Sequence, residues 1–161
     1  MDNLVRDPVI IQTKLGALRI QFSPRGLSRL EFYKAGALPS TSKRQQAVSL
    51  PYNLERQLQR YAAGSSVRWN VPLDLSSGTE FQQQVWRTLT RIPRGETRSY
   101  GWVAKRVGNP MASRAVGSAC GANPVPIIVP CHRVIAGNGS IGGFGGGLPM
   151  KRRLLALEKD G

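Results

Sequence analysis

The spacing of apolar residues changes partway along this chain of 161 residues. In the first third, runs of alternating apolar and polar residues are separated by turn residues, a pattern typical of strands with one buried face. After about residue 52, apolar residues mostly recur every three or four positions, as they do along one side of a helix. A small sheet followed by helices predicts an α+β fold, within the broad α/β class.

The first third of the chain predicts an antiparallel meander followed by one helix. The three strands are expected at Val9–Lys14, Leu18–Phe22 and Leu27–Tyr33. The polar segment 35–51 contains two prolines and is expected to be a loop. Helical spacing then predicts a helix over Tyr52–Ala63, and it ends at Gly64 because glycine suits the left-handed backbone that follows many helices.

A linker is expected near the middle of the chain. Val67–Val71 alternates like a further strand, and Pro72–Gly78 has the composition of a connection between two compact units. A chain of this length can form one ordinary domain or two small ones. We therefore expect a boundary near Ser76, with one domain over residues 1–76 and a second over residues 77–161.

The second domain begins with helix signals. Thr79 is a good N-cap for one helix, and Ser99 for another that ends at Gly108. Asn109 followed by Pro110 is expected to begin a third helix, because proline lacks the N–H that the first helical turn leaves unpaired. Two short helices joined by a tight turn are typical of a helix-turn-helix, although an ordinary helical hairpin has the same pattern.

The charge of the chain favours nucleic acid as a partner. It holds 23 Lys or Arg against 9 Asp or Glu, a formal net charge of +14, and most of the excess lies after residue 80. A basic surface can also serve solubility alone. No apolar run approaches the ~18 residues of a membrane span. The first residues lack the basic start and apolar middle of a secretory signal, so we expect a cytoplasmic protein.

The helix after the expected turn, Ala112–Cys120, carries a single long polar side chain, Arg114, among small residues. Helices that read bases usually present Asn, Gln or Lys, whereas small residues allow close approach to DNA without sequence readout. We therefore expect such a helix to lie close to a groove of DNA, held by phosphate contacts and by one inserted side chain, Arg114. Further contacts are expected from its small neighbours Ala112, Ser113, Ala115 and Gly117. Alternatively, these small residues pack against a neighbouring helix.

The sole histidine of the chain follows one of its two cysteines. A proline-bracketed apolar segment, expected to be a strand, leads into Cys131, and His132 comes next. Adjacent side chains do not face each other on a helix or strand, so a bridging water is more natural than a direct Cys–His hydrogen bond. Glu158, on a helix expected over Pro149–Lys159, is the candidate that orients the imidazole. The alternatives are a structural cysteine and a solvated acid at a helix end.

A loop over residues 137–147 contains seven glycines, which permit close approach of backbone N–H groups to a ligand, with Phe144 as an apolar wall. The loop matches GxGxxG, but the chain ends too soon for the βαβ unit that a dinucleotide site needs. Neither CxxC nor HxxxH occurs, and Cys120 and Cys131 are interpreted as free thiols. We therefore expect no cofactor and no metal.

These motifs resemble those of the O(6)-alkylguanine-DNA alkyltransferases, also called methylated-DNA–protein-cysteine methyltransferases. The run Pro130-Cys131-His132-Arg133-Val134 reproduces the active-site signature of that family. The resemblance extends from Phe81 to Glu158 and includes, in order, Ser99-Tyr100, Arg114, Asn123-Pro124-Val125-Pro126, the glycine-rich loop and Leu154-Leu155-Ala156-Leu157-Glu158. The first half of the chain agrees only in pattern with the family's small sheet-plus-helix domain.

The resemblance implies DNA repair by direct reversal. Family members flip an alkylated guanine out of the duplex and transfer its alkyl group irreversibly to a cysteine, here Cys131; O(4)-alkylthymine is a poorer substrate. It implies that His132 deprotonates Cys131 through a water and that Glu158 orients His132. Tyr100 would donate a proton to, or polarise, a ring nitrogen of the leaving guanine. Asn123 would tie the recognition helix to the cysteine segment.

Further expectations concern the base pocket, the fold and the partner. By resemblance, the Val134 carbonyl and the Gly145 N–H recognise the base beside Phe144, and Arg114 fills the gap that the base leaves. The implied fold is a ribonuclease H-like first domain and a second domain with a winged helix-turn-helix. The implied partner is double-stranded DNA, bound from the minor groove by a monomer that can act cooperatively. Cys120 stands where an apolar residue is usual and is interpreted as a packing residue, with a reactive bystander thiol as the alternative.

Two rival functions remain open at this point. A non-catalytic lesion-binding or regulatory helix-turn-helix protein would use the same fold, although such proteins usually lack the cysteine that this chain has at Cys131. A Cys–His hydrolase is disfavoured because the pair is adjacent and no oxyanion hole is evident.

Overall fold

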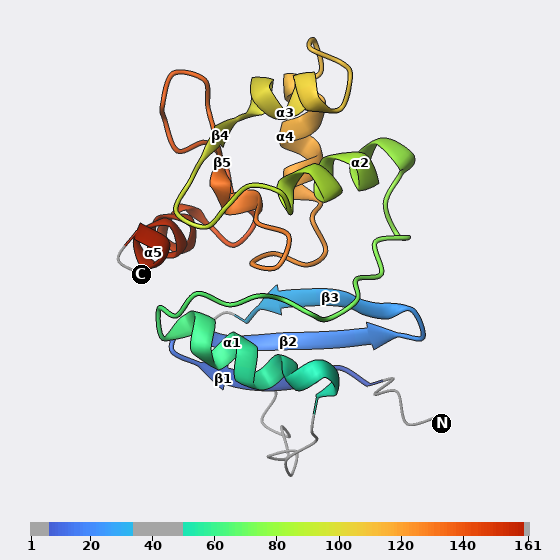
Figure 1. The fold of residues 1–161 in the computed structure, drawn as a ribbon, viewed down its shortest axis with the longest axis vertical. Coiled ribbons are helices and arrows are strands. Elements are labelled where there is room, and N and C mark those ends of the chain that lie inside the picture. The colour runs from blue at the N-terminus through green and yellow to red at the C-terminus, as the bar shows by residue number, and fades with distance from the viewer. Residues whose placement is uncertain (1–6, 34–49, 160–161) are drawn as a thin grey trace. The chain divides into compact units, whose positions relative to one another are not determined.

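The computed structural model describes residues 7–33 and 50–159 (Figure 1). Contacts divide the chain into two compact units, Met1–Asp74 and Leu75–Gly161. Among the described residues, the first unit contains a three-stranded antiparallel sheet and one α-helix, and the second contains four α-helices. The prediction of a mixed fold with a small sheet is therefore confirmed. Most of the predicted loop 35–51 lies outside the described residues.

The sheet of the first unit is the predicted meander, in the order β1-β2-β3 (Figure 1). Its strands are β1 (Val9–Thr13), β2 (Gly16–Ser23) and β3 (Gly26–Phe32). Ile20 of the central strand pairs with Val9 on one side and Leu30 on the other. All three side chains are buried, so the alternating pattern of the sequence does mark the face of the sheet that forms the core.

One helix completes the core of the first unit. The short 3-10 helix η1 (Pro51–Asn53) leads into α1 (Leu54–Ala62), which contacts β1. The apolar side chains that α1 buries are Leu54, Leu58, Tyr61 and Ala62. As predicted, the helix is followed by Gly64 in a left-handed conformation, with φ of 94°.

The segment Val67–Val71 is not the strand that its alternation predicted. Its residues alternate between half-buried and exposed up to Asn70 and Val71 is buried, but among the described residues the segment pairs with no strand. The alternation arises instead from packing on α1, where the Trp69 ring lies 5.8 Å from the Tyr61 ring. Pairing with β3 begins only afterwards, when Leu27 donates to Pro72 O at 2.8 Å.

Gly26 lies tightly against Pro72 and provides a test of this packing. Its φ is +148°, and a Cβ there would lie 2.3 Å from the carbonyl oxygen of Pro72. We expect Gly26→Ala to lower the free energy of unfolding by about 2–4 kcal/mol. The alanine would adopt a strained positive φ, and the backbone at Pro72 would have to move away from its Cβ. Urea denaturation measures this. Gly16→Ala is the matched control: its φ is +104° with open space around it, so a loss of only about 1 kcal/mol is expected. Equal losses would contradict the assigned clash.

The second unit is built on four α-helices. They are α2 (Glu80–Leu89), α3 (Tyr100–Arg106), α4 (Ser113–Gly121) and α5 (Leu148–Lys159). The first three pack against one another, and the buried Trp86 indole N–H donates to Ala119 O at 2.8 Å. Two short strands, β4 (Arg98–Ser99) and β5 (Val134–Ile135), pair in parallel and bring the start of α3 beside the residues that follow Cys131.

The helix starts follow the predicted caps in two cases of three. Thr79 forms a complete capping box with Gln82, and the Ser99 hydroxyl accepts from Trp102 N at 3.0 Å. The prediction that Asn109 begins the next helix is wrong. Ala112 N donates to Asn109 O, which closes a turn over residues 109–112, and α4 begins one residue later at Ser113.

The apolar segment before Cys131 is a series of turns and not the strand that was expected. Three prolines, at positions 124, 126 and 130, remove the N–H groups that a ladder would need. Ile127 has φ of 74°, in the left-handed region, and Val129 N donates to Val125 O at 2.9 Å. The segment therefore folds compactly and delivers Cys131 into the interior of the unit.

Candidate active site

Cys131 begins the 3-10 helix η2 (Cys131–Arg133), and only 5% of it is exposed. Asn123 closes the preceding turn, since its Nδ2 donates to Val129 O at 2.8 Å and its Oδ1 accepts from Val125 N at 3.0 Å. Burial raises the pKa of the Cys131 thiol, while a hydrogen bond with the Asn123 side chain opposes that rise. The structure thus brings Asn123 and Cys131 together.

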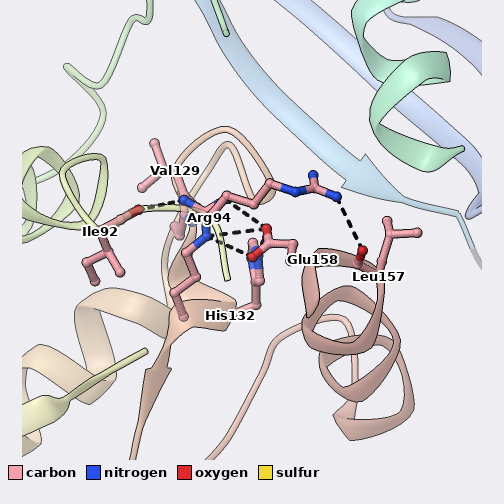
Figure 2. A network of polar contacts seen from close by, with 8 residues as sticks. Ile92, Arg94, Val129, His132, Leu157 and Glu158 are labelled. Atoms are coloured by element: carbon pink, nitrogen blue, oxygen red, sulfur yellow. Dashed lines mark hydrogen bonds and ion pairs between the residues drawn. The ribbon is translucent and has the colours of Figure 1, made fainter. Parts of the chain in front are cut away.

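A buried polar network surrounds His132, the residue that follows the cysteine in the sequence (Figure 2). The His132 side chain is fully buried, and its Nε2 lies 2.7 Å from Glu158 Oε1. The Arg133 guanidinium donates to both carboxylate oxygens of Glu158, at 2.8 and 2.9 Å, and to Ile92 O at 2.6 Å. The Arg94 guanidinium donates to Leu157 O at 3.2 Å, on the helix α5 that also carries Glu158. The carboxylate of Glu158 is therefore held firmly in one orientation.

The electrostatics of this network favour a neutral histidine beside an ionised carboxylate. Burial lowers the pKa of His132 and outweighs the opposing effect of Glu158. Burial alone would raise the pKa of the Glu158 carboxyl, but hydrogen bonds from His132 and Arg133 lower it well below its usual range. His132 Nε2–H then donates to Glu158. Nδ1 remains a free acceptor, since it is buried without a hydrogen-bond partner among the described residues.

A cavity of about 340 Å³ opens onto the Cys131 thiol. This volume falls within the usual range of small-ligand sites, about 300–1,000 Å³. The cavity is built from the start of α3, one side of α4, η2 and the glycine-rich loop. Its lining residues are Tyr100, Gly117, Cys120, Gly121, Cys131, Gly143, Phe144 and Gly145.

Tyr100 and the loop meet inside this cavity. A Cβ added at Gly142 would lie 2.6 Å from the Tyr100 hydroxyl, so glycine is required for the loop to approach so closely. Burial, followed by the nearby Cys120 thiol, raises the pKa of Tyr100, and a backbone hydrogen bond with Gly143 opposes the rise. The hydroxyl consequently keeps its proton at neutral pH and can donate it in a hydrogen bond.

Of the three residues expected to recognise a base, two line the cavity and one does not. Phe144 and Gly145 line the cavity. Val134 is fully buried in β5 and is not one of the lining residues, and its carbonyl already accepts from Lys151 Nζ at 2.7 Å. A carbonyl oxygen has two lone pairs, so a second donor can still bind there.

The recognition-helix residues expected to contact DNA lie at the start of α4. Arg114 and Ala115 are exposed, Ser113 and Gly117 are half-buried, and Ala112 immediately precedes the helix. Val116 and Ala119 are buried against the other helices. The small residues are therefore divided between packing and surface, and the guanidinium of Arg114 is on the surface.

Sequence reasoning left the role of Cys120 open between packing and reactivity, and it missed Lys151. Cys120 is not merely a packing residue, because it lines the cavity together with Cys131. Lys151 is fully buried on α5. It stands three residues before Leu154 and seven before Glu158, on the buried side of the helix, and this spacing is the signal that could have revealed it.

Residues 7–33 and 50–159 contain neither a cluster of metal-ligating side chains nor a helix suited to cross a membrane. No group of three or more His, Cys, Asp or Glu side chains there converges on a point where a metal ion could bind. None of the helices in this part of the chain combines the length and apolar content that crossing a membrane requires.

The sequence is similar to methyltransferases that act on DNA. Residues 80–160 match the family model described as 6-O-methylguanine DNA methyltransferase, DNA binding domain. A methylated-DNA–protein-cysteine methyltransferase of Mycobacterium tuberculosis is 57% identical over 104 residues, which cover 65% of this chain and 62% of the relative's own length. The Mycobacterium leprae protein of the same name is 52% identical over 126 residues, or 78% of this chain and 72% of the relative.

Solved structures extend the similarity to nearly the whole chain. The crystal structure of Mycobacterium tuberculosis OGT in complex with DNA superposes with a TM-score of 0.82 at 43% identity, covering 95% of this chain and 93% of that one. An O6-methylguanine-DNA methyltransferase from Pyrococcus kodakaraensis gives a TM-score of 0.56 at 25% identity, with coverage of 88% and 90%. A match of sequence over the second unit and of structure over both units places this chain in the family of the 6-O-methylguanine DNA methyltransferases.

Proposed function

We propose that the chain repairs DNA by moving the alkyl group of O6-alkylguanine irreversibly to Cys131, and less efficiently that of O4-alkylthymine. The observation that carries this proposal is the cavity lined by Cys131 next to the buried His132–Glu158 pair. In the transfer, the sulfur forms a bond to the alkyl carbon while the bond from carbon to guanine O6 breaks, and the electron pair leaves with the guanine. The resulting thioether is stable, so each chain acts once.

The network around His132 supports a proton relay for this step. A water that bridges the Cys131 thiol to His132 Nδ1 would take the thiol proton to this buried nitrogen, which has no hydrogen-bond partner in the part of the chain that the structure describes. The imidazolium formed would be stabilised by Glu158, at 2.7 Å from Nε2. The Tyr100 hydroxyl would then polarise a ring nitrogen of the departing guanine, which makes it a better leaving group. No cofactor is needed, because the cysteine itself accepts the alkyl group.

Recognition of the lesion is proposed to proceed by base flipping. Helices α3 and α4 would act as a winged helix-turn-helix on the minor groove, and the exposed Arg114 would fill the gap left by the extruded base. The flipped base would enter the cavity beside Phe144, with the Gly145 N–H and the Val134 carbonyl as hydrogen-bonding partners. Ala112, Ser113, Ala115 and Gly117 would lie close to the DNA without reading its sequence.

The remaining proposals concern the organisation of the protein. We place the boundary between its domains near Ser76, with a ribonuclease H-like first domain over 1–76 and the transfer domain over 77–161. The meander followed by α1 supports the first assignment.

The location and the oligomeric state are further proposals. Two free thiols suit a reducing compartment, which supports a cytoplasmic location. The protein is proposed to act as a monomer that can bind DNA cooperatively.

Duplex DNA with a labelled methyl group on guanine O6 tests the proposed function. Transfer predicts one label per chain, located on Cys131 by mass spectrometry of the peptides, and unmodified guanine in the DNA. Tight binding of the lesion without label would instead indicate a lesion-binding or regulatory protein. Hydrolysis of an ester substrate with turnover would indicate a Cys–His hydrolase.

The role of Arg114 gives a prediction of its own. Arg114→Ala is expected to slow transfer from duplex DNA by about 10- to 100-fold, because the side chain that fills the gap left by the flipped base is lost. This change in rate corresponds to ~1–3 kcal/mol. Reaction with free O6-benzylguanine should be nearly unchanged, since no base has to be flipped. Arg87→Ala, an exposed cation on α2, is the control for loss of charge. Equal losses with both substrates would remove the proposed role.

A further inference from the structure

Cations gather around one aromatic ring on helix α3. The guanidinium carbons of Arg98 and Arg106 lie 5.4 and 5.1 Å from the centre of the Trp102 ring, in the range of a cation–π contact. Lys105 and Arg106 are exposed, whereas Arg98 and Trp102 are half-buried. These four residues are called the Trp102 cluster. Two cations that share one ring repel each other unless anions compensate their charge.

The charge of Arg98 is compensated within the protein. Its guanidinium donates to Glu96 Oε1 at 3.0 Å and to Thr97 O at 2.9 Å. The side chains of Lys105 and Arg106 form no ion pair or hydrogen bond with the part of the chain that the structure describes. The indole ring therefore holds one guanidinium, that of Arg106, whose charge is left for an anion from outside the chain.

The Trp102 cluster lies beside the start of the expected recognition helix. Helix α3 packs against α4 (Figure 1), and a Cβ at Gly101 would lie 3.8 Å from Ser113 Oγ, so the two helices nearly touch there. Lys105 is one helical turn after Gly101. Arg106 is one turn after Trp102, on the neighbouring side of the helix. In a helix-turn-helix, the second helix lies in a groove while the first crosses the DNA backbone.

The chemistry of the cluster suits a phosphate diester. A guanidinium stacked on an indole keeps its N–H groups at the edge of its plane, where they can donate to two oxygens of one phosphate. Stacking also holds the flexible side chain of Arg106 before the anion arrives, so less conformational entropy is lost on binding. Lys105 supplies a second charge on the same exposed surface.

We propose that Trp102 holds Arg106 ready to bind the phosphate backbone of duplex DNA, that Lys105 binds a neighbouring phosphate, and that α3 thereby adds affinity without preference for sequence or lesion. Arg98, fixed by Glu96, helps to keep the indole ring in place. This inference rests on the proposed function, because α4 must be the helix that enters the groove.

The salt dependence of DNA binding tests the two phosphate contacts. The probe is a short undamaged duplex, titrated with the full chain at several concentrations of NaCl. Arg106→Gln should weaken binding about five- to tenfold near about 0.1 M salt, and it should lower the steepness of log K against log[salt] by about 0.9, as expected for one lost phosphate contact. Lys105→Gln should act in the same way. Arg87→Gln, which removes an exposed cation from α2, is the matched control and should leave the slope unchanged.

Trp102 is a positioning residue, and a double-mutant cycle tests its role. Trp102→Leu removes the ring but no charge, and it should weaken binding about threefold. The same change should have little further effect in an Arg106→Gln background, because the ring acts through that guanidinium. Trp102→Phe retains an aromatic face and should bind nearly as well as the wild type. If Trp102→Leu does not fold, Arg106→Gln and Trp102→Phe remain decisive.

Two results would overturn the inference. Unchanged slopes in both Arg106→Gln and Lys105→Gln would assign these cations to the helix dipole, which favours them in the last turn of α3, or to an acidic protein partner. A loss confined to lesion-containing duplex would indicate base recognition, since phosphates carry no information about the base. Failure of the proposed function is distinguishable, because the wild type would then take no label from O6-methylguanine DNA, whereas its binding to undamaged duplex would still report the slopes.

Discussion

Cys131→Ala is expected to abolish alkyl transfer completely. The proposed reaction forms a bond to sulfur, and no water, hydroxyl or amine in the cavity offers a comparable nucleophile at neutral pH. Lesion-containing duplex DNA should still bind with nearly unchanged affinity, because the exposed residues of α4 are untouched. The measurements are the label recovered on the protein and a binding titration with the same DNA. Cys131→Ser should behave in the same way, since a serine hydroxyl does not ionise in this environment.

Cys120→Ala is the matched control for this prediction. Cys120 lines the same cavity, and burial raises the pKa of its thiol to about 12. It is therefore almost entirely protonated at neutral pH, and its removal should leave the label on Cys131 at one per chain. A labelled Cys131→Ala protein would contradict the assignment of the acceptor, and label on Cys120 would transfer that role to the second thiol.

Local signals in the sequence predicted the elements that local interactions determine. The caps at Thr79 and Ser99 depend on side chains that reach backbone groups three residues away, so they were visible in the sequence. The meander was equally predictable, because each of its strands pairs with its neighbour through a short turn. The last helix, α5, begins within one residue of the predicted position.

The predictions that failed were those in which one pattern has two physical causes. Alternation over Val67–Val71 reflects packing against α1 and not a ladder, and a sequence does not show which neighbour is present. The main-chain carbonyl of Asn109 closes a turn with Ala112, and asparagine is a residue type that suits turns and N-caps alike. In the segment before Cys131, apolar composition suggested a strand, although its prolines argued against one.

The site itself depends on contacts that span the second unit. His132 and Glu158 are 26 residues apart, and the sequence provided a motif for pairing them but no geometry. The guanidinium of Arg133 binds the same carboxylate, a contact that no spacing rule anticipates. Lys151 was missed because lysine usually lies on a surface, and its buried position becomes evident only when β5 and the loop are both in place.

Glu158→Gln is expected to destabilise the second unit by about 3–5 kcal/mol, because it leaves the Arg133 guanidinium without the carboxylate that compensates its burial. Transfer should also slow, since the amide cannot stabilise an imidazolium at His132 as a carboxylate does. Urea denaturation near pH 7 and the rate of label transfer measure the two effects. Glu80→Gln replaces an exposed carboxylate on α2 and should change the free energy of unfolding by less than about 1 kcal/mol.

The pH dependence of the free energy of unfolding tests the His132–Glu158–Arg133 network, because the pKa shifts of His132 and Glu158 both predict a loss of stability in acid. The pKa of Glu158 is lower in the folded protein than its ordinary value of 4.5, so its contribution is fully present above that pH and is lost as the pH falls through the folded value. The pKa of His132 is lowered from 6.5, so the unfolded chain takes up a proton first and stability already declines below that pH. The wild type should therefore lose stability in two stages on acidification, and Glu158→Gln should lack the lower one. A variant with the same acid profile as the wild type would show that Glu158 is not ionised in the folded protein, and the orientation of His132 would then need another cause.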